Sequence, residues 1–134
     1  MLRVKKNNLT PHIYKDSRGW VANPIEKSVL PSKEFGHIHI VSIEPNALRG
    51  NHYHNIHNEW AIIFGGKYLF AWFDREEDKV IKEIVEEDSF VIYEIPLTVP
   101  HVFKNIDQKT VYLMAYYDHE FDSKNPDMIR YNLI

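Results

Sequence analysis

The stretch RGNHYHNIHNEW, from Arg49 to Trp60, holds three of the chain's eight histidines together with an arginine and a glutamate. Histidine is mostly neutral at pH 7, so charge alone is a poor reason for such a cluster. In a β-strand alternate side chains share a face, so His52 and His54 point the same way while Tyr53 points the opposite way. Two imidazoles on one strand face can bind a single metal ion. The stretch therefore indicates a strand that carries part of a metal site.

Two further residues can complete that site. Glu59 begins the next expected strand after a short loop, and His101 opens a strand after the proline-bounded turn PLTVPH. Three histidines and one carboxylate suit Zn²⁺, Fe²⁺, Mn²⁺ or Ni²⁺, and the ligand set alone does not choose among them. We therefore predict a divalent metal bound by His52, His54, Glu59 and His101, with His101 reaching the site from across the fold. The alternative is a set of histidines bonded to one another or to water.

Outward from this stretch, the chain reads as short strands separated by turns. Alternating apolar and β-branched residues predict strands over Gly36 to Ile43, Val80 to Glu87, Ser89 to Ile95, His101 to Ile106 and Thr110 to Tyr117, with a short strand near the C-terminus. The dipeptide Gly65-Gly66 predicts a hairpin between two strands within Glu59 to Phe73. The run EEDKVIKEIVEED predicts a solvated edge that deters strand addition. Many short strands without a long amphipathic helix indicate a β-sandwich, barrel or jelly roll.

Composition limits the classes of function. A chain of 134 residues suits one domain with one core, and the formal net charge of −3 favours neither nucleic acid nor an anionic membrane as partner. The absence of cysteine excludes disulfides and thiolate metal sites. No apolar run approaches the roughly 20 residues of a membrane span, and the N-terminus lacks the apolar region of a secretory signal. We therefore expect a cytoplasmic protein.

These motifs resemble the cupin superfamily. Its first motif matches HYHNIHNEWAIIFGG, with Gly50 just before His52, and its second matches IPLTVPHVFKN, with Thr98 where cupins usually carry glycine. The resemblance implies an all-β cupin jelly roll, formed as a single domain over residues 1–134. A homodimer is expected, because a small open barrel with many apolar strands must cover its edges.

A narrower resemblance rests on DSRGW, RGNHYH and FDSKNPD. These segments are similar to the sugar-nucleotide branch of the cupins, which includes the dTDP-4-dehydrorhamnose 3,5-epimerases, and especially to the zinc-binding C-terminal cupin domain of capsular polysaccharide epimerase/reductases. The resemblance implies zinc as the metal and a nucleotide-linked 4-keto-6-deoxy sugar as the small-molecule substrate. The implied reaction is epimerisation or isomerisation in surface polysaccharide biosynthesis, by proton abstraction next to the ketone.

The same resemblance implies roles for further residues. In the rhamnose-pathway epimerases, the first histidine of the RG-x-H motif is the base, and it corresponds to His52. We assign His52 as a ligand, and as the base only if no metal binds. The base is then open among His57, His37, His39 and a tyrosine. The tyrosine that acts as the general acid in the epimerases corresponds to a position near Met114 or Ala115. The neighbouring tyrosines are Tyr112, Tyr116 and Tyr117, and Tyr116 is the candidate for this role.

The remaining predictions concern residues that contact the substrate, and structural alternatives to the functional roles. Arg49 can hold a sugar or pyrophosphate oxygen through its planar guanidinium, and His37 and His39 correspond to pocket-lining positions in the relatives. The alternative for Arg49 is an ion pair with a carboxylate such as Asp16. A solvated loop is the simpler reading for His57, and a surface position for His12 and His119. Two other functions stay open: a non-catalytic cupin that binds a sugar or another small molecule, and a metal-dependent dioxygenase.

Overall fold

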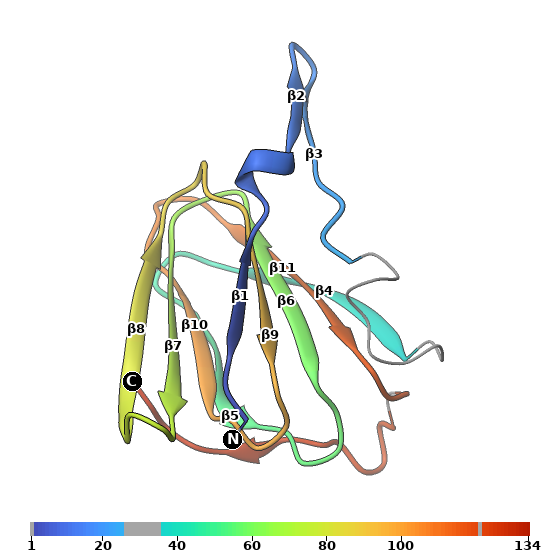
Figure 1. Ribbon diagram of the computed structural model, residues 1–134, viewed down its shortest axis with the longest axis vertical. Helices are drawn as coiled ribbons and strands as arrows, with labels where there is room; N and C mark the ends of the chain where they lie inside the picture. Colours follow the sequence, from blue (N-terminus) through green and yellow to red (C-terminus); the bar gives the residue numbers. More distant parts are fainter. Residues whose placement is uncertain (1, 26–35, 121) are drawn as a thin grey trace.

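A computed structural model describes residues 2–25, 36–120 and 122–134 of the chain (Figure 1). Two antiparallel five-stranded sheets pack face to face. The first runs in the order β1 (Lys5–Asn8), β9 (Val91–Ile95), β6 (Glu59–Phe64), β11 (Val111–Tyr117) and β4 (His37–Ile43). The second runs in the order β12 (Ile129–Arg130), β5 (Leu48–Tyr53), β10 (His101–Asn105), β7 (Tyr68–Asp74) and β8 (Lys79–Val85). This arrangement confirms the predicted all-β jelly roll.

A small third sheet projects from one end of the jelly roll. It is a hairpin of β2 (Tyr14–Asp16) and β3 (Gly19–Val21), which follows a 3₁₀ turn (Thr10–His12) and stands above the two main sheets in Figure 1. These N-terminal elements and β1 were not predicted from the sequence pattern. Among the described residues, none forms a helix with the length and apolarity that a membrane span requires.

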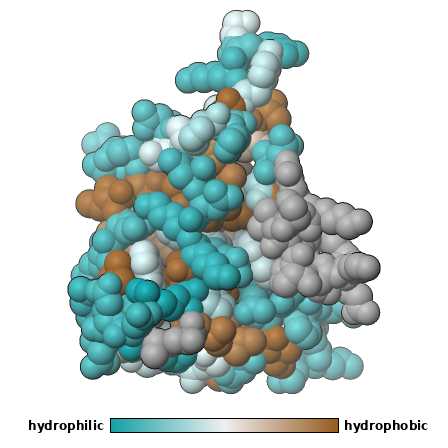
Figure 2. Space-filling view, viewed as in Figure 1, coloured by the Kyte–Doolittle hydropathy of each residue, from teal (hydrophilic) through white to brown (hydrophobic). Residues whose placement is uncertain are grey.

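The apolar core fills the space between the two main sheets. Phe70 of β7 stacks on Phe103 of β10 with ring centroids 4.4 Å apart, and it reaches Tyr93 of the facing sheet at 4.2 Å. A second, smaller cluster of Trp60, Ile92 and Tyr116 lies apart from this core, where Leu9 and Ile25 pack against it. On the face shown in Figure 2 the surface is mostly hydrophilic, with separate hydrophobic patches. Burial of one face of each sheet therefore accounts for the alternation of apolar and polar residues along the strands.

The predicted hairpin at Gly65-Gly66 is wrong. β6 pairs with β9 and β11 in the first sheet, whereas β7 pairs with β10 and β8 in the second. The turn, in which Gly65 has a φ of +96°, therefore carries the chain from one sheet to the other instead of folding it back on itself. The prediction for the charged run is confirmed, because β8 lies at the edge of the second sheet.

A bulge between β5 and β10 sets the positions of two of the predicted ligands. His52 lies opposite His101, but the next residue, Val102, lies opposite Gly50, so Asn51 is an extra residue on β5. Gly50 has a φ of +121°, and a Cβ built on it would stand 2.6 Å from the carbonyl oxygen of His101. Only glycine permits this close approach of the two backbones. The bulge therefore places the His52 and His101 imidazoles side by side.

Candidate metal centre and adjoining pocket

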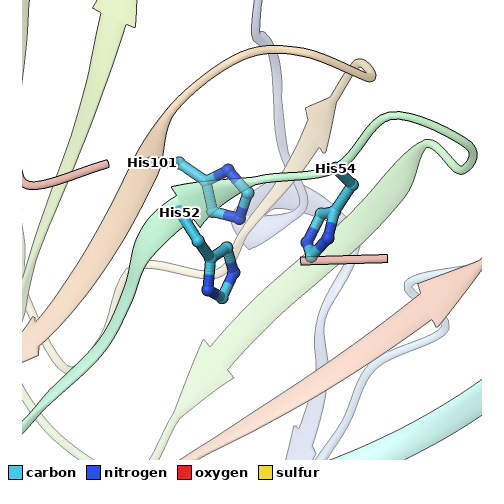
Figure 3. A group of neighbouring side chains, drawn as sticks. All are labelled: His52, His54 and His101. Carbon is cyan, nitrogen blue, oxygen red and sulfur yellow. The ribbon is translucent and has the colours of Figure 1, made fainter. Parts of the chain in front are cut away.

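The four predicted ligands come together between the two sheets. His52 lies on β5, His54 directly follows that strand, and His101 opens β10, so all three histidines belong to the second sheet. One ring nitrogen from each lies within 4.8 Å of the others, and Figure 3 shows the three rings gathered in one place. Glu59 opens β6 of the facing sheet.

The predicted direction of approach is reversed in the structure. The sequence pattern placed His101 across the fold and Glu59 on a strand next to the histidines. Consecutive strands here enter different sheets, so Glu59 reaches the site from the facing sheet. The ladder partner of β5 is β10, and His101 therefore stands beside His52.

The hydrogen bonds around the site fix which nitrogens face its centre. A carbonyl oxygen can only accept, so the His101 Nδ1 donates to Val99, 2.9 Å away, and the His54 Nδ1 donates to Asp127. The Nε2 atoms of these histidines then face the Glu59 Oε2, at 3.1 Å from His101 and 3.4 Å from His54.

This geometry leaves buried polar atoms that a bound cation would satisfy. Among the described residues, the His54 Nε2 and the Glu59 Oε2 are buried without a hydrogen-bond partner. Lone pairs that face one another in a buried site repel unless a positive charge lies between them. The donor set, three imidazole nitrogens and a carboxylate, is one that divalent transition metals accept. The residues present therefore fit a divalent metal ion.

Electrostatics give two of the predicted ligands the protonation states that such an ion needs. Burial acts to raise the pKa of Glu59, but interaction with the adjacent His101 and His54 imidazoles brings it well below its usual value. Burial, reinforced by the neighbouring His101 and His54, lowers the pKa of His52 to about 3. At neutral pH Glu59 is therefore a carboxylate and His52 a neutral imidazole with a free lone pair, as metal ligands must be.

Two adjoining cavities give access to this centre. The larger, about 250 Å³, is walled by histidines and by residues of the C-terminal segment that include Asp127 and Met128, and the smaller, about 130 Å³, contains Glu59 and His101 in its lining. Both are lined by His39, His52 and Tyr117. The site is thus a concave pocket with convergent polar groups, as small-molecule sites usually are.

The predicted substrate-contact residues all line these cavities. His37 and His39 of β4 lie against the ring of Tyr117, with centroids 4.8 and 4.7 Å away, and they line the larger cavity. Arg49 lines the smaller one and donates to the carbonyl of Ser42. The alternative partner of Arg49, Asp16, instead pairs with Arg18 at 2.6 Å on the projecting hairpin.

The structure does not bring Tyr116 to the pocket. Side chains alternate along β11, and Tyr116 points to the far side of the sheet, where its hydroxyl accepts a hydrogen bond from the Gly36 N–H. Tyr117 points inward and lines both cavities. Burial, together with the negative charges of Glu59 and Asp127, raises the pKa of Tyr117, so its phenol keeps its proton.

His57 and Asp127 differ most from the sequence-based reading. The expected solvated loop position of His57 is wrong, because the residue is only 7% exposed and its ring stacks on Tyr117 with centroids 3.9 Å apart. Burial, and then the nearby His54, lowers the pKa of His57 to about 4. Asp127 lies within the FDSKNPD motif but has no role in the sequence-based prediction, and no spacing rule connects it to the histidines. The surface positions of His12 and His119 are confirmed.

Comparison with known proteins gives a family match over most of the chain. Residues 14–129 match the family model described as the polysaccharide biosynthesis C-terminal domain. No curated protein matches the sequence. Together with the strand arrangement, this match confirms the predicted cupin resemblance.

Solved structures with the same fold include three bacterial sugar-processing proteins. The capsular polysaccharide assembling protein CapF from Staphylococcus aureus is 22% identical with a TM-score of 0.68, and the match covers 75% of this chain but 27% of CapF. A dTDP sugar isomerase from Desulfovibrio desulfuricans G20 is 13% identical with a TM-score of 0.79, and the match covers 96% and 83% of the two chains. The sugar 3,4-ketoisomerase QdtA from Thermoanaerobacterium thermosaccharolyticum, in complex with TDP, is 19% identical with a TM-score of 0.68, with 95% and 87% covered. The chain thus spans about a quarter of the length of CapF.

Proposed function

The chain belongs to the family of polysaccharide biosynthesis C-terminal domains, and on this premise we propose that it is a metal-dependent epimerase or isomerase of nucleotide-linked sugars. The observation that carries the proposal is the set of buried, mutually facing lone pairs at His54, Glu59 and His101, at the floor of a pocket large enough for part of a sugar. Zinc is the expected metal.

Proteins with the same fold favour this class of reaction. One is a dTDP sugar isomerase, another is a 3,4-ketoisomerase in complex with TDP, and a third, ChmJ from Streptomyces bikiniensis, is a 3′-monoepimerase in complex with dTDP-quinovose. A 4-keto-6-deoxy sugar linked to a nucleotide is the proposed substrate, because a ketone acidifies the protons on the carbons beside it. When bound, a divalent ion supplies Lewis-acid stabilisation of the enolate that proton removal creates.

Two side chains are placed to move the proton. His39 is half-buried, lines both cavities and is held neutral, because burial lowers its pKa. Tyr117 lies beside it with ring centroids 4.7 Å apart and keeps its phenolic proton. In the proposed reaction His39 accepts the proton from the carbon next to the ketone, and Tyr117 returns one. Arg49 holds a sugar or pyrophosphate oxygen, and His52 acts as a ligand.

Solvent exchange tests the proposal. The zinc-loaded protein is incubated in D₂O with dTDP- and UDP-linked 4-keto-6-deoxy sugars, and the expected result is deuterium at a carbon flanking the ketone. His54→Ala is expected to abolish exchange, whereas His12→Ala, at an exposed position, is expected to preserve it. Absence of exchange with every donor would overturn the proposal. Tight sugar binding without exchange would favour the binding module, and oxygen uptake by the Fe²⁺ form would favour the dioxygenase.

A further inference from the structure

The C-terminal segment, residues 122–134, is fastened along the strand that carries the ligands. β12 pairs with β5, so that Ile129 lies opposite Tyr53. The Asn51 side chain donates to the carbonyl of residue 134 and accepts the N–H of residue 133, at 3.0 and 2.9 Å. Continued by two residues, the same antiparallel register places Asp127 opposite the loop that follows β5. The segment is therefore anchored directly after the position at which it meets the metal centre.

The Asp127 carboxylate organises that loop. It accepts the backbone N–H groups of Asn55, Ile56 and His57 at 2.7, 2.7 and 3.1 Å. The His57 Nδ1 lies 3.0 Å from the same carboxylate, which favours a proton on that nitrogen. Burial acts to raise the pKa of Asp127, but the three backbone donors and His57 lower it overall, so the group stays ionised. One carboxylate thus holds both the backbone of the loop and the ring of His57.

The Asp127 backbone holds a second imidazole. Its carbonyl oxygen accepts the Nδ1–H of His54, so the Nδ1 atoms of His54 and His57 both face Asp127. Their Nε2 atoms then carry the lone pairs, and both atoms are buried without a partner among the described residues. The two rings lie 4.1 Å apart, and His57 is held between His54 and Tyr117. Whatever fixes His57 therefore also supports a predicted ligand.

We propose that Asp127 is a positioning residue. Through it, the C-terminal segment sets the tautomer and the ring orientation of the ligand His54 and of the adjacent His57. A hydrogen bond to the outer nitrogen of a ligating imidazole fixes its tautomer and orientation, and its loss commonly lowers metal affinity about 10–100-fold. The group of His54, His57 and Asp127 is not taken as a second cation site, because the carboxylate already accepts three backbone N–H donors and lies against the His57 Nδ1. The inference rests on the proposed metal centre but needs no turnover of a sugar.

The most direct test uses the unmodified protein. Long-range ¹H–¹⁵N NMR of the metal-free protein at pH 7 reports which imidazole nitrogen carries the proton. The expected result is the Nδ1–H tautomer at both His54 and His57, although free imidazole side chains favour Nε2–H. A predominant Nε2–H tautomer at His57 would overturn the proposal without recourse to any variant.

Variants then test the link to metal affinity. Asp127→Ala is expected to shift His57 towards Nε2–H and to weaken Zn²⁺ binding, measured by chelator competition, by about 10–100-fold. Asp127→Asn keeps one acceptor oxygen, so partial recovery of affinity is expected. Asp122→Ala is the matched control, because Asp122 is exposed, lies in the same segment and accepts the N–H of Lys124. Unchanged affinity in folded Asp127→Ala, or an equal loss in Asp122→Ala, would refute the proposal. Correct tautomers and Zn²⁺ affinity without sugar exchange would count against the proposed reaction alone.

Discussion

Replacement of Gly50 by alanine is expected to destabilise the protein strongly and to disturb the metal centre. The new Cβ would stand 2.6 Å from the His101 carbonyl oxygen and 2.7 Å from the Val102 Cα, both backbone atoms that cannot rotate away. A non-glycine residue at a φ of +121° costs about 1–3 kcal/mol by itself. Relief of the contact requires β5 to move away from β10, which weakens one or two ladder hydrogen bonds worth about 1 kcal/mol each. We expect a total loss of about 4 kcal/mol.

Gly19→Ala provides a matched control for the backbone strain. Gly19 has a φ of +136°, but no described atom lies within 4 Å of the position where its Cβ would stand. That variant should therefore lose only the strain energy, about 1–3 kcal/mol. The assay is urea unfolding of both metal-free variants, followed by Zn²⁺ titration. Gly50→Ala should be clearly less stable than Gly19→Ala and should bind Zn²⁺ more weakly, because His52 faces His101 across the bulge. Equal stabilities of the two variants would refute the reasoning.

Three further predictions follow from local geometry. Thr98 has a φ of +67°, and Arg75 donates hydrogen bonds to its hydroxyl and carbonyl oxygens. Thr98→Gly should retain metal binding. It should change the free energy of unfolding by less than about 1 kcal/mol, because the relief of backbone strain offsets the loss of the hydroxyl hydrogen bond. Backbone and side-chain donors lower the pKa of Asp74, so its stabilising effect is present above about pH 4 and is lost as the pH falls through its folded-state pKa. Thermal unfolding as a function of pH should therefore show that Asp74→Asn is less stable than the wild type at neutral pH. Its stability should also fall less steeply than that of the wild type as the pH is lowered. Tyr117→Phe should slow product formation about 10²–10⁴-fold while Zn²⁺ binding persists, and Tyr116→Phe should leave product formation unchanged.

The convergence of the four candidate ligands was predictable because each of them carries a local signature. Strand alternation pairs His52 with His54, and the prolines around the turn before His101 mark the start of a strand. Such signals show which residues face a common side, but they do not show which sheet each strand enters. That is why Glu59 and His101 were assigned the wrong directions and why Gly65-Gly66 was read as a hairpin.

The features that the sequence did not predict depend on which face of a strand a side chain occupies and on pairing between strands far apart in the sequence. Tyr116 and Tyr117 are neighbours in sequence yet point to opposite faces of β11, so an uncertainty of one residue reverses the assignment. Asp127 meets His54 and His57 only because β12 pairs along β5 about seventy residues away in sequence. A two-residue strand has too little pattern to predict its partner. Residues that support a ligand through such a pairing become visible only in three dimensions.

Metal binding by the metal-free protein tests the central claim most directly. Competition titration with Zn²⁺, followed by elemental analysis after dialysis, should give one tightly bound ion per chain. His54→Ala and Glu59→Gln should each lose that ion, whereas His12→Ala should keep it. A wild-type chain that retains no divalent ion, or a His54→Ala variant that binds one as tightly as the wild type, would contradict the account.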